Sequence, residues 1–258
     1  MATTKTIQSL ERAFSILELF QNNKSELSLK EISDSLELNK STTFGLVNSL
    51  NTLGYLLQND ENQKYSLGLK ILSLTNSMKM NNIIIRASRP FLEELSNKVN
   101  ETVHSAQEVN GSVVYLDKVE ALTSIYINTQ MGTQAYMHCT AVGKSLLAYK
   151  PKDELDIFLS RKLKKLTYNT ITDPDKLRQE LNKTRERGYS VDDEEIEIGL
   201  SCIAVPVMKS INTSAFALSV SAPTARMCPA NMEVFIKEAK ETSKKISETV
   251  FGYTEDNI

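Results

Sequence analysis

The sequence predicts an α+β protein with an N-terminal winged helix-turn-helix, a linker helix and a C-terminal antiparallel sheet with packed helices. Three observations support this fold class. Residues 27–67 follow the pattern helix, short turn, helix, hairpin. From position 90 onward, strand and helix patterns alternate, with hairpin turns in place of regular βαβ crossovers. At 258 residues the chain is long enough for about two domains. We expect the domain boundaries to be 1–68, 69–89 and 90–258.

The first helix is predicted over about residues 6–21. Its apolar residues recur at helical spacing and are Ile7, Leu10, Ala13, Phe14, Leu17 and Phe20. We expect this stripe to pack behind the helix-turn-helix, as the third helix that such a domain needs. In many winged-helix proteins the first helix also contributes to dimer contacts.

The helix-turn-helix is indicated by capping residues as well as by periodicity. Ser28 is placed as an N-cap, with Glu31 as its capping-box partner. Asn39 or Ser41 can cap the second helix, and Gly54 stands where a C-cap is expected. The apolar residues of the two helices are Leu29, Ile32 and Leu36, then Leu46, Val47, Leu50 and Leu53. The strands of the predicted wing are 55–58 and 64–67.

The second helix of this motif is predicted to enter the major groove of DNA. Residues 39–58 include one lysine and no acid, so nothing there repels phosphate. Short hydroxyl and amide side chains can bond phosphate oxygens or base edges, and a helix N-terminus favours anions. The predicted DNA-binding residues are Lys40, Ser41, Thr42, Thr43 and Asn48. The alternative is a small helical hairpin used for protein contacts.

Charge and composition limit the classes of partner. The net charge is −2, and residues 1–68 carry six basic against eight acidic residues, so DNA binding must depend on local charge placement. Three cysteines imply no disulfide framework and suit a reducing cytoplasm. No run approaches the roughly 18 apolar residues of a membrane span, and the polar N-terminus lacks a signal-peptide core. We therefore expect a cytoplasmic protein without membrane contact.

The linker and the C-terminal domain are predicted from periodicity and turn residues. The linker helix is interrupted near residues 81–82, and the apolar run 83–85 suits either core or a dimer surface. Pro90 is expected to open the next helix, and Asn110 with Gly111 is the strongest hairpin signal in the chain. The expected helices are 90–99, 140–148, 152–159, 174–187 and 231–250. The expected strands are 102–109, 112–119, 124–129, 201–209 and 215–221.

A candidate anion-binding pocket combines one helix start with one strand. Thr140 is an expected N-cap, and the small residues after it let a carboxylate approach free backbone N–H groups. These residues are Ala141, Val142 and Gly143. Ser219 and Ser221 alternate on one strand, so both hydroxyls point to the same face. Serine pairs are also common in ordinary strand packing.

Catalysis is the competing interpretation of this domain. His138 and Cys139 lie at a helix start and Cys202 begins an apolar strand, so an enzyme acting on a small acid through Cys202 or His138 is the alternative. No third orienting residue accompanies them, and a buried cysteine is usually inert packing. With His104 as the other histidine, no Cys/His metal site has a recognisable spacing. The acidic run 192–195 suits either a divalent cation or solvent, and no cofactor is predicted.

Five segments in this order resemble the IclR family of transcriptional regulators over nearly the whole chain. They are IQSLERAFSILELF, LSLKEISDSLELNKSTTFGLVNSLNTLGYL with a wing ending YSLGLKIL, MGTQAYMHCTAVGKSLLAY, GYSVDDEEIEIGLSCIAVPV and AFALSVSAPTARM. The resemblance implies a winged helix, a linker helix and an effector domain with a profilin/GAF-like sheet. It also implies operator binding as dimers or tetramers, and sensing of small molecules that are often carboxylates or aromatic acids.

The resemblance assigns an effector pocket by position. The implied residues are Ala141, Val142, Gly143, Asp192, Leu200, Cys202, Ser219 and Ser221. Asp192 is the awkward member, because its charge opposes that of an acid. The sequence departs from the family pattern at two places: Gly45 stands where the recognition helix often has Arg, and residues 134–136 replace a Pro-containing approach to His138.

These observations lead to one hypothesis and two alternatives. We expect a DNA-binding transcriptional regulator whose C-terminal domain senses a small organic acid. A homodimer or homotetramer is expected on operator DNA, because two-fold dimers match palindromic half-sites about 34 Å apart. Repression is the commoner mode in the family, while activation also occurs. The alternatives are the enzyme acting on a small acid and a winged helix that binds protein instead of DNA.

Overall fold

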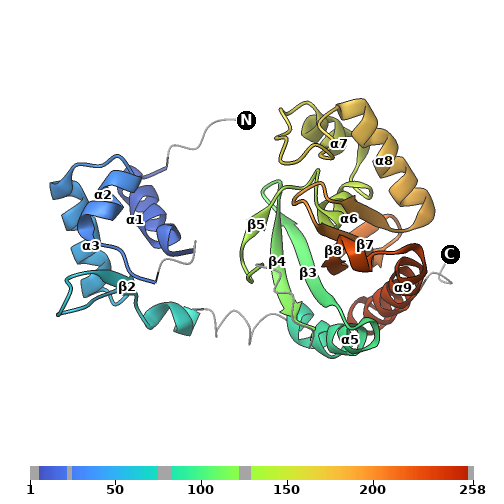
Figure 1. Cartoon of the computed structure of the whole chain (residues 1–258), viewed down its shortest axis with the longest axis horizontal. Helices are drawn as coiled ribbons and strands as arrows, with labels where there is room; N and C mark the ends of the chain where they lie inside the picture. Colours follow the sequence, from blue (N-terminus) through green and yellow to red (C-terminus); the bar gives the residue numbers. More distant parts are fainter. Residues whose placement is uncertain (1–5, 22–24, 75–82, 122–128, 255–258) are drawn as a thin grey trace. The chain divides into compact units, whose positions relative to one another are not determined.

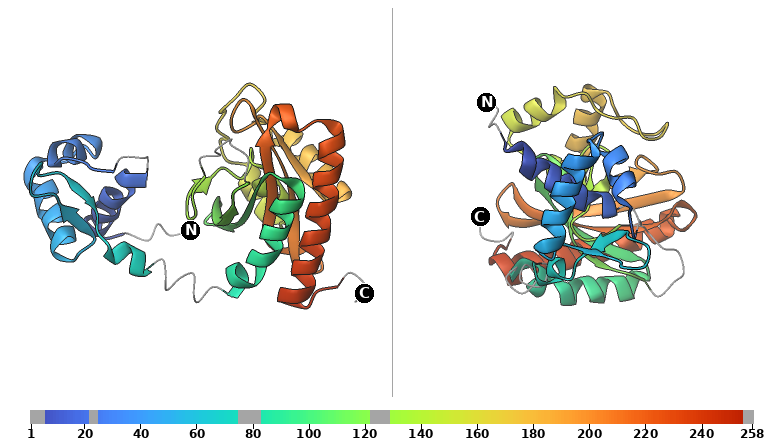
Figure 2. Two further views of the ribbon diagram at one scale, coloured as in Figure 1. Left: turned by 60° about the horizontal axis from the view of Figure 1, so that its bottom comes forward. Right: turned by 90° about the vertical axis from the view of Figure 1, so that its left-hand side faces the viewer.

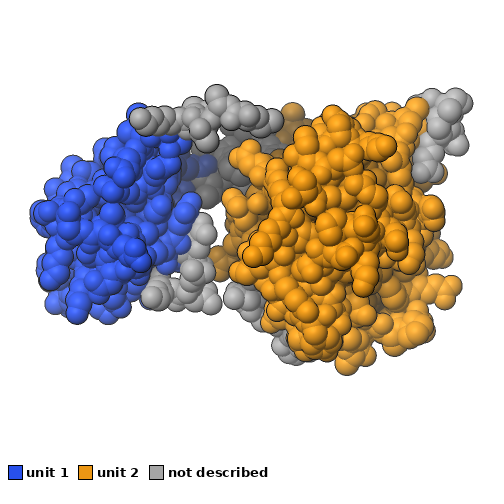
Figure 3. Space-filling view, turned by 90° about the horizontal axis from the view of Figure 1, so that it is seen from above, with its two compact units in different colours: residues 1–82 blue, residues 83–258 orange. Residues whose placement is uncertain are grey.

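The computed structural model describes residues 6–21, 25–74, 83–121 and 129–254. The chain divides into two compact units, Met1–Asn82 and Ile83–Ile258 (Figure 3). The division falls within the region predicted as a linker helix. Each unit encloses hydrophobic core of its own.

Unit 1 is built from a helix, a helix-turn-helix and a two-stranded hairpin (Figure 1). Its elements are α1 (Gln8–Glu18), η1 (Leu19–Gln21), α2 (Leu29–Ser35), α3 (Lys40–Thr52), β1 (Leu56–Gln58) and β2 (Tyr65–Leu67). The core consists of Ile16, Phe20, Leu27, Ile32, Val47, Leu50, Leu56 and Tyr65. The predicted winged helix-turn-helix is confirmed.

The predicted caps of the two motif helices are confirmed. The Ser28 side chain accepts a hydrogen bond from the Glu31 N–H, and the Glu31 carboxylate accepts one from the Ser28 N–H at 2.8 Å. Asn39 caps α3, because its Oδ1 accepts the Thr42 N–H at 2.9 Å. Gly54 has a φ of +80°, the left-handed conformation that favours glycine after a helix.

The packing predicted for α1 is wrong for half of the apolar stripe. Ile7, Leu10 and Phe14 have exposed fractions of 64, 54 and 62%. The core side of the helix is formed instead by Ile16, with Phe20 in the turn that follows. Residues 7, 10 and 14 are spaced to share one helical face, and residues 13, 16, 17 and 20 share another. The helix therefore has two apolar faces, and one of them faces solvent.

Unit 2 is an antiparallel sheet with helices on both faces. Its helices are α5 (Ile83–Val99), α6 (Ala141–Leu147), α7 (Lys152–Leu159), α8 (Pro174–Arg187), η2 (Thr224–Arg226) and α9 (Pro229–Phe251). Its strands are β3 (Thr102–Val109), β4 (Ser112–Val119), β5 (Gln134–Ala135), β6 (Ser190–Asp193), β7 (Leu200–Ser210) and β8 (Thr213–Pro223). The strand order is β5-β4-β3-β8-β7-β6.

The two faces of this sheet carry separate hydrophobic clusters. Helices α5 and α9 lie side by side against one face (Figure 2). Helix α6 lies against the other face, where it contacts β3, β6, β7 and β8, and α8 packs on α6. All seven residues of α6 are buried as a result.

The pairing of β3 with β4 confirms the predicted hairpin. Val109 pairs with Ser112, and the two turn residues Asn110 and Gly111 have φ values of +53° and +81°. Two edge strands, β5 and β6, were not predicted. The strand predicted at 124–129 lies outside the described residues except for its last position, Thr129, which is not in a strand.

The prediction that Pro90 opens a helix is wrong. Helix α5 begins at Ile83 and runs through Pro90. The proline is exposed, so its ring projects into solvent, and packing of Ile84 and Ile85 against the α5/α9 cluster holds the first turns in place. These two isoleucines are therefore partly core, while Ile83 is 77% exposed. The linker interruption predicted at 81–82 lies outside the described residues.

Candidate functional site

The exposed face of α3 is the candidate nucleic-acid interface. Lys40, Ser41 and Asn48 are exposed, as predicted for DNA-binding residues, and Thr42 is half-buried. The prediction that Thr43 binds DNA is wrong. Its side chain is fully buried, and its hydroxyl donates to the Asn39 carbonyl oxygen at 3.0 Å. Thr43 lies on the core side because it is one helical turn from Val47.

The turn of the wing, residues 59–63, carries negative charge and no positive charge. Asp60 and Glu61 are exposed in its turn, and the carboxylate of Glu26 accepts hydrogen bonds from Asn59 and Asn62 at 3.2 and 2.8 Å. The bonds from Asn62 and Asn59 hold the pKa of Glu26 below its ordinary value. The wing turn therefore repels phosphate, and α3 presents the surface that suits DNA.

In unit 2, the sheet register brings the predicted effector residues together. Asp192 pairs with Cys202, and Cys202 pairs with Ser221. In the neighbouring row Ser219 pairs with His104. Directly paired residues share a face of the sheet, and here it is the face that α6 covers. The apolar predicted residues Ala141, Val142 and Leu200 belong to the same cluster.

Gly143 does not offer the free N–H that was predicted for it. Its N–H donates to the Thr140 hydroxyl, which caps α6 at 3.2 Å. The glycine is needed for a different reason, since a Cβ there would lie 2.3 Å from the Met137 carbonyl oxygen. Gly143 therefore permits a close backbone approach and is not a donor to a ligand.

His104 is a member of this polar face that sequence reasoning missed. Its Nδ1 lies 3.4 Å from the Ser221 hydroxyl, and its Nε2 lies 2.6 Å from the hydroxyl of Thr129. Burial lowers the pKa of His104 to about 3, so the imidazole is neutral. The Tyr115 ring packs 5.2 Å from it, centroid to centroid. No local signal marks His104, because its neighbours are set by strand pairing.

A buried ion pair lies beside the same face. Lys144 on α6 pairs with Glu195, and their side chains are 1 and 6% exposed. Asp192 Oδ1 accepts the Glu195 N–H at 2.8 Å and so holds the turn that carries Glu195. Burial raises the pKa of Asp192 to about 7 and also raises that of Glu195. Within the part of the chain that the structure describes, residues 192–195 join no cluster able to hold a metal ion.

The geometry gives no support to a Cys–His nucleophile. Burial raises the pKa of Cys139 to about 12, and it also raises that of Cys202. The Nε2 of His138 is engaged with the Lys164 carbonyl oxygen at 2.8 Å. A thiol needs to ionise to act as a nucleophile, and these two stay protonated. Cys228, the third cysteine, is exposed.

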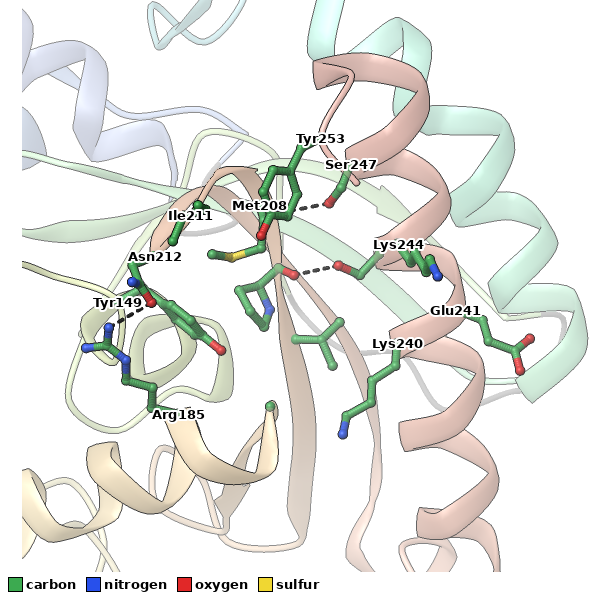
Figure 4. Close-up of a pocket in the computed structure, with 14 residues that line it drawn as sticks. Tyr149, Arg185, Met208, Ile211, Asn212, Lys240, Glu241, Lys244, Ser247 and Tyr253 are labelled. Carbon is green, nitrogen blue, oxygen red and sulfur yellow. Dashed lines mark hydrogen bonds between the residues drawn. The ribbon is translucent and has the colours of Figure 1, made fainter. Parts of the chain in front are cut away.

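A cavity of about 770 Å³ lies elsewhere in unit 2, between α8, α9 and β7 (Figure 4). None of the predicted effector residues lines it. Two of its three cations have partners in the protein: Arg185 donates to Asn212 at 2.9 Å, and Lys240 donates to the Arg187 carbonyl oxygen at 2.6 Å. The predicted effector residues gather instead on the α6 face, where Asp192, Ser219 and Ser221 are buried polar groups.

Two family models match this chain. "IclR helix-turn-helix domain" matches residues 9–60, and "Bacterial transcriptional regulator IclR C-terminal" matches residues 76–248. The chain belongs to the IclR family. An IclR-family helix-turn-helix binds operator DNA, so this protein is a DNA-binding transcriptional regulator. None of the helices that the structure describes is long and apolar enough to cross a bilayer.

IclR relatives match along nearly their whole length. KdgR of Escherichia coli K12 is 32% identical over 243 residues, which cover 94% of this chain and 92% of KdgR. XynR of the same organism is 34% identical over 248 residues, with coverage of 96 and 98%. AllR of Klebsiella pneumoniae, a transcriptional repressor, is 29% identical over 244 residues, with coverage of 94 and 90%.

Solved IclR structures share the fold. The crystal structure of Thermotoga maritima IclR has a TM-score of 0.79 and 31% identity, covering 96% of this chain and 100% of that one. An IclR homologue of Microbacterium hydrocarbonoxydans, crystallised with 4-hydroxybenzoate, has a TM-score of 0.82 and 22% identity, covering 95 and 100%. The fold class predicted from sequence is thus confirmed by family models and by solved structures.

Proposed function

We propose that this protein is a repressor that binds operator DNA through α3 and releases it when a small organic acid binds beneath α6. The observation that carries the proposal is the sheet register, with Cys202 beside Ser221 and Ser219 beside His104 on one buried face. The relative AllR is a repressor, which supports repression as the mode of regulation.

The chemistry of this face suits a carboxylate. Ser219 and Ser221 supply hydroxyl groups, and His104 supplies a neutral imidazole whose contacts with Ser221 and Thr129 a carboxylate would replace in part. Because the pKa of Asp192 is raised to about 7, this carboxyl can hold a proton near neutral pH and donate to an acid instead of repelling it. The apolar neighbour Leu200 favours a compact organic acid over a phosphorylated sugar.

A carboxylate effector is also supported by one relative of known fold. The Microbacterium hydrocarbonoxydans homologue is bound to 4-hydroxybenzoate, an aromatic acid. We propose the same chemical class for this chain, with the carboxylate held by the serine hydroxyls and the remainder of the molecule against Val142 and Leu200.

Calorimetry on the full chain tests the site. The ligands are a panel of aliphatic and aromatic monocarboxylates that includes 4-hydroxybenzoate. The best ligand is expected to bind Ser219→Ala/Ser221→Ala at least about tenfold more weakly, because two charge-assisted hydrogen bonds are lost. Ser201→Ala is the matched control, since Ser201 lies on β7 with its side chain on the opposite face. Unchanged binding by the double variant would place the effector elsewhere.

A further inference from the structure

The exposed face of α3 includes an aromatic ring that the fold of unit 1 does not use. The Phe44 side chain is 54% exposed, while Val47 and Leu50 of the same helix belong to the core. Phe44 is absent from that core, and among the described residues no ring or cation contact involves it. A single exposed apolar side chain is common on protein surfaces, so the residues that share this face with Phe44 decide whether it belongs to a partner surface.

Phe44 shares its face with residues able to read DNA. Ser41, Phe44, Gly45 and Asn48 stand at positions i, i+3, i+4 and i+7, and all four are exposed. Ser41 and Asn48 have hydrogen-bonding side chains, so the ring sits between two polar contact positions. The helix carries no acidic residue, and Lys40 is exposed at its first turn.

Gly45 beside the ring packs against none of the described residues of unit 1. A Cβ placed there would meet nothing within 4 Å, and the residue has ordinary helical geometry. Glycine inside a helix costs about 1 kcal/mol relative to alanine. The bare backbone at this position leaves room for a partner surface to approach the helix next to Phe44.

We propose that Phe44 determines sequence specificity by contacting the C5-methyl group of a thymine in the major groove, with Gly45 permitting the close approach. The methyl group of thymine is the apolar feature of that groove, and aromatic rings are among the side chains that contact it. A phenyl ring cannot bond a phosphate, so it adds sequence information and no general affinity. The inference rests on the operator binding proposed above.

The test separates the methyl group from all other features of the base. The full chain is used to select sequences from a randomised duplex library, and each thymine of the selected duplex is then replaced in turn by deoxyuridine, which lacks only the methyl. At one thymine per half-site, the wild type is expected to bind the uracil duplex about fourfold more weakly. That ratio is the roughly 0.8 kcal/mol of one buried methyl group converted at 1.4 kcal/mol per tenfold.

Phe44→Ala should bind the thymine and uracil duplexes equally. Two control variants isolate the ring: Asn48→Ala is expected to lose affinity and keep the thymine preference, and Leu57→Ala, which removes a 61% exposed side chain from the wing, is expected to keep both. Circular dichroism establishes that each variant is folded.

The possible outcomes distinguish a failure of the Phe44 inference from a failure of the proposed operator binding. If the wild type selects a sequence, and wild type and Phe44→Ala prefer thymine over uracil to the same extent, the role of Phe44 is overturned and operator binding stands. Selection of no sequence by the wild type overturns both. If Phe44→Ala alters the oligomeric state and leaves the thymine preference unchanged, the ring belongs to a protein contact and the inference is again overturned.

Discussion

Gly143 and Gly45 are both helical glycines, and their surroundings impose opposite constraints. At Gly143 the Met137 backbone occupies the space where a side chain would begin, with its carbonyl oxygen 2.3 Å from the ideal Cβ position. At Gly45 that position is open to solvent. The first glycine is therefore required by packing in unit 2, whereas the second weakens α3 without any gain in unit 1.

The two alanine variants should consequently change stability in opposite directions. Gly143→Ala is expected to lower the free energy of unfolding of unit 2 by about 1–3 kcal/mol, the usual cost of overpacking. Gly45→Ala is expected to raise that of unit 1 by about 0.5–1 kcal/mol. Urea unfolding of the full chain, followed by circular dichroism and tyrosine fluorescence, measures both. A neutral Gly143→Ala would mean that the 137–143 segment can shift at no cost.

A second residue-scale prediction concerns pH. The pKa of buried Asp192 is raised to about 7 from an ordinary value of 3.8, and Lys144 and Glu195 are the charged groups beside it. Between these values the folded state keeps a proton that the unfolded state releases, so the free energy of unfolding falls as pH rises from about 4 to 7. Asp192→Asn should flatten this slope. Glu195, whose pKa is also raised, leaves a residual slope of the same sign.

Urea titrations of the wild type and Asp192→Asn at a series of pH values give the comparison. The amide oxygen that the Asp192→Asn change introduces can still accept the Glu195 N–H, so the turn is preserved. Parallel profiles for the two proteins would show that the Asp192 carboxyl is already ionised well below neutral pH.

At the scale of elements, α1 is a helix with two apolar faces. One face supplies the core of unit 1, and the other leaves Ile7, Leu10 and Phe14 along a shallow groove that faces solvent. An exposed apolar strip on the first helix suits contact with a second copy of the chain. The predicted dimer, which operator half-sites also favour, stays a prediction.

Phe14→Glu is therefore expected to shift the protein toward smaller species in light scattering at micromolar concentration. A glutamate at this position would place a charge in the predicted contact, while the core residue Ile16 remains in place. Val234→Glu on α9, where the wild-type side chain is 50% exposed, is the control for adding a charge to an exposed apolar site. Equal masses for all three proteins would exclude the α1 strip from the assembly.

Elements whose signals are local could be predicted from the sequence. The capping box of Ser28 and Glu31, the Asn39 cap and the Asn110–Gly111 hairpin all depend on residues within a few positions of one another. The edge strands β5 and β6 were missed because strands of two and four residues are too short to show a periodic pattern. His104 and the Lys144–Glu195 pair were missed because their partners are distant in sequence, so that sheet register and the position of α6 decide what surrounds them.

At the scale of the whole molecule, the proposed response to an acid requires unit 2 to influence DNA binding by unit 1. Such coupling is reciprocal: the factor by which the acid weakens DNA binding equals the factor by which DNA weakens acid binding. We expect the two factors to be equal and to lie between about 5 and 150, the usual range for coupling between two sites. Calorimetric titration with the acid, in the presence and absence of saturating selected duplex, measures the effect of DNA on acid binding. Gel-shift assays with and without the acid measure its effect on DNA binding. Unequal factors would mean that the acid also binds DNA-bound protein at another site.

The salt dependence of DNA binding follows from the charge of unit 1. The DNA-facing helix carries Lys40 as its one cation, and the wing turn is acidic. Each phosphate neutralised by the protein contributes about 0.9 to the slope of log affinity against log salt. A shallow slope, corresponding to a few phosphates per half-site, is therefore expected from titrations between about 50 and 200 mM salt, a range in which this effect is measurable. A steep slope would indicate cationic contacts from outside α3.

The uneven burial of the three cysteines makes the molecule suitable for spectroscopy without redesign. Cys139 and Cys202 are buried thiols that remain protonated, whereas Cys228 is exposed at the start of α9. A maleimide dye near neutral pH should therefore attach at one defined point in unit 2. With a second dye on an operator duplex, energy transfer from that point would report in real time on the arrival and departure of DNA as an acid is added.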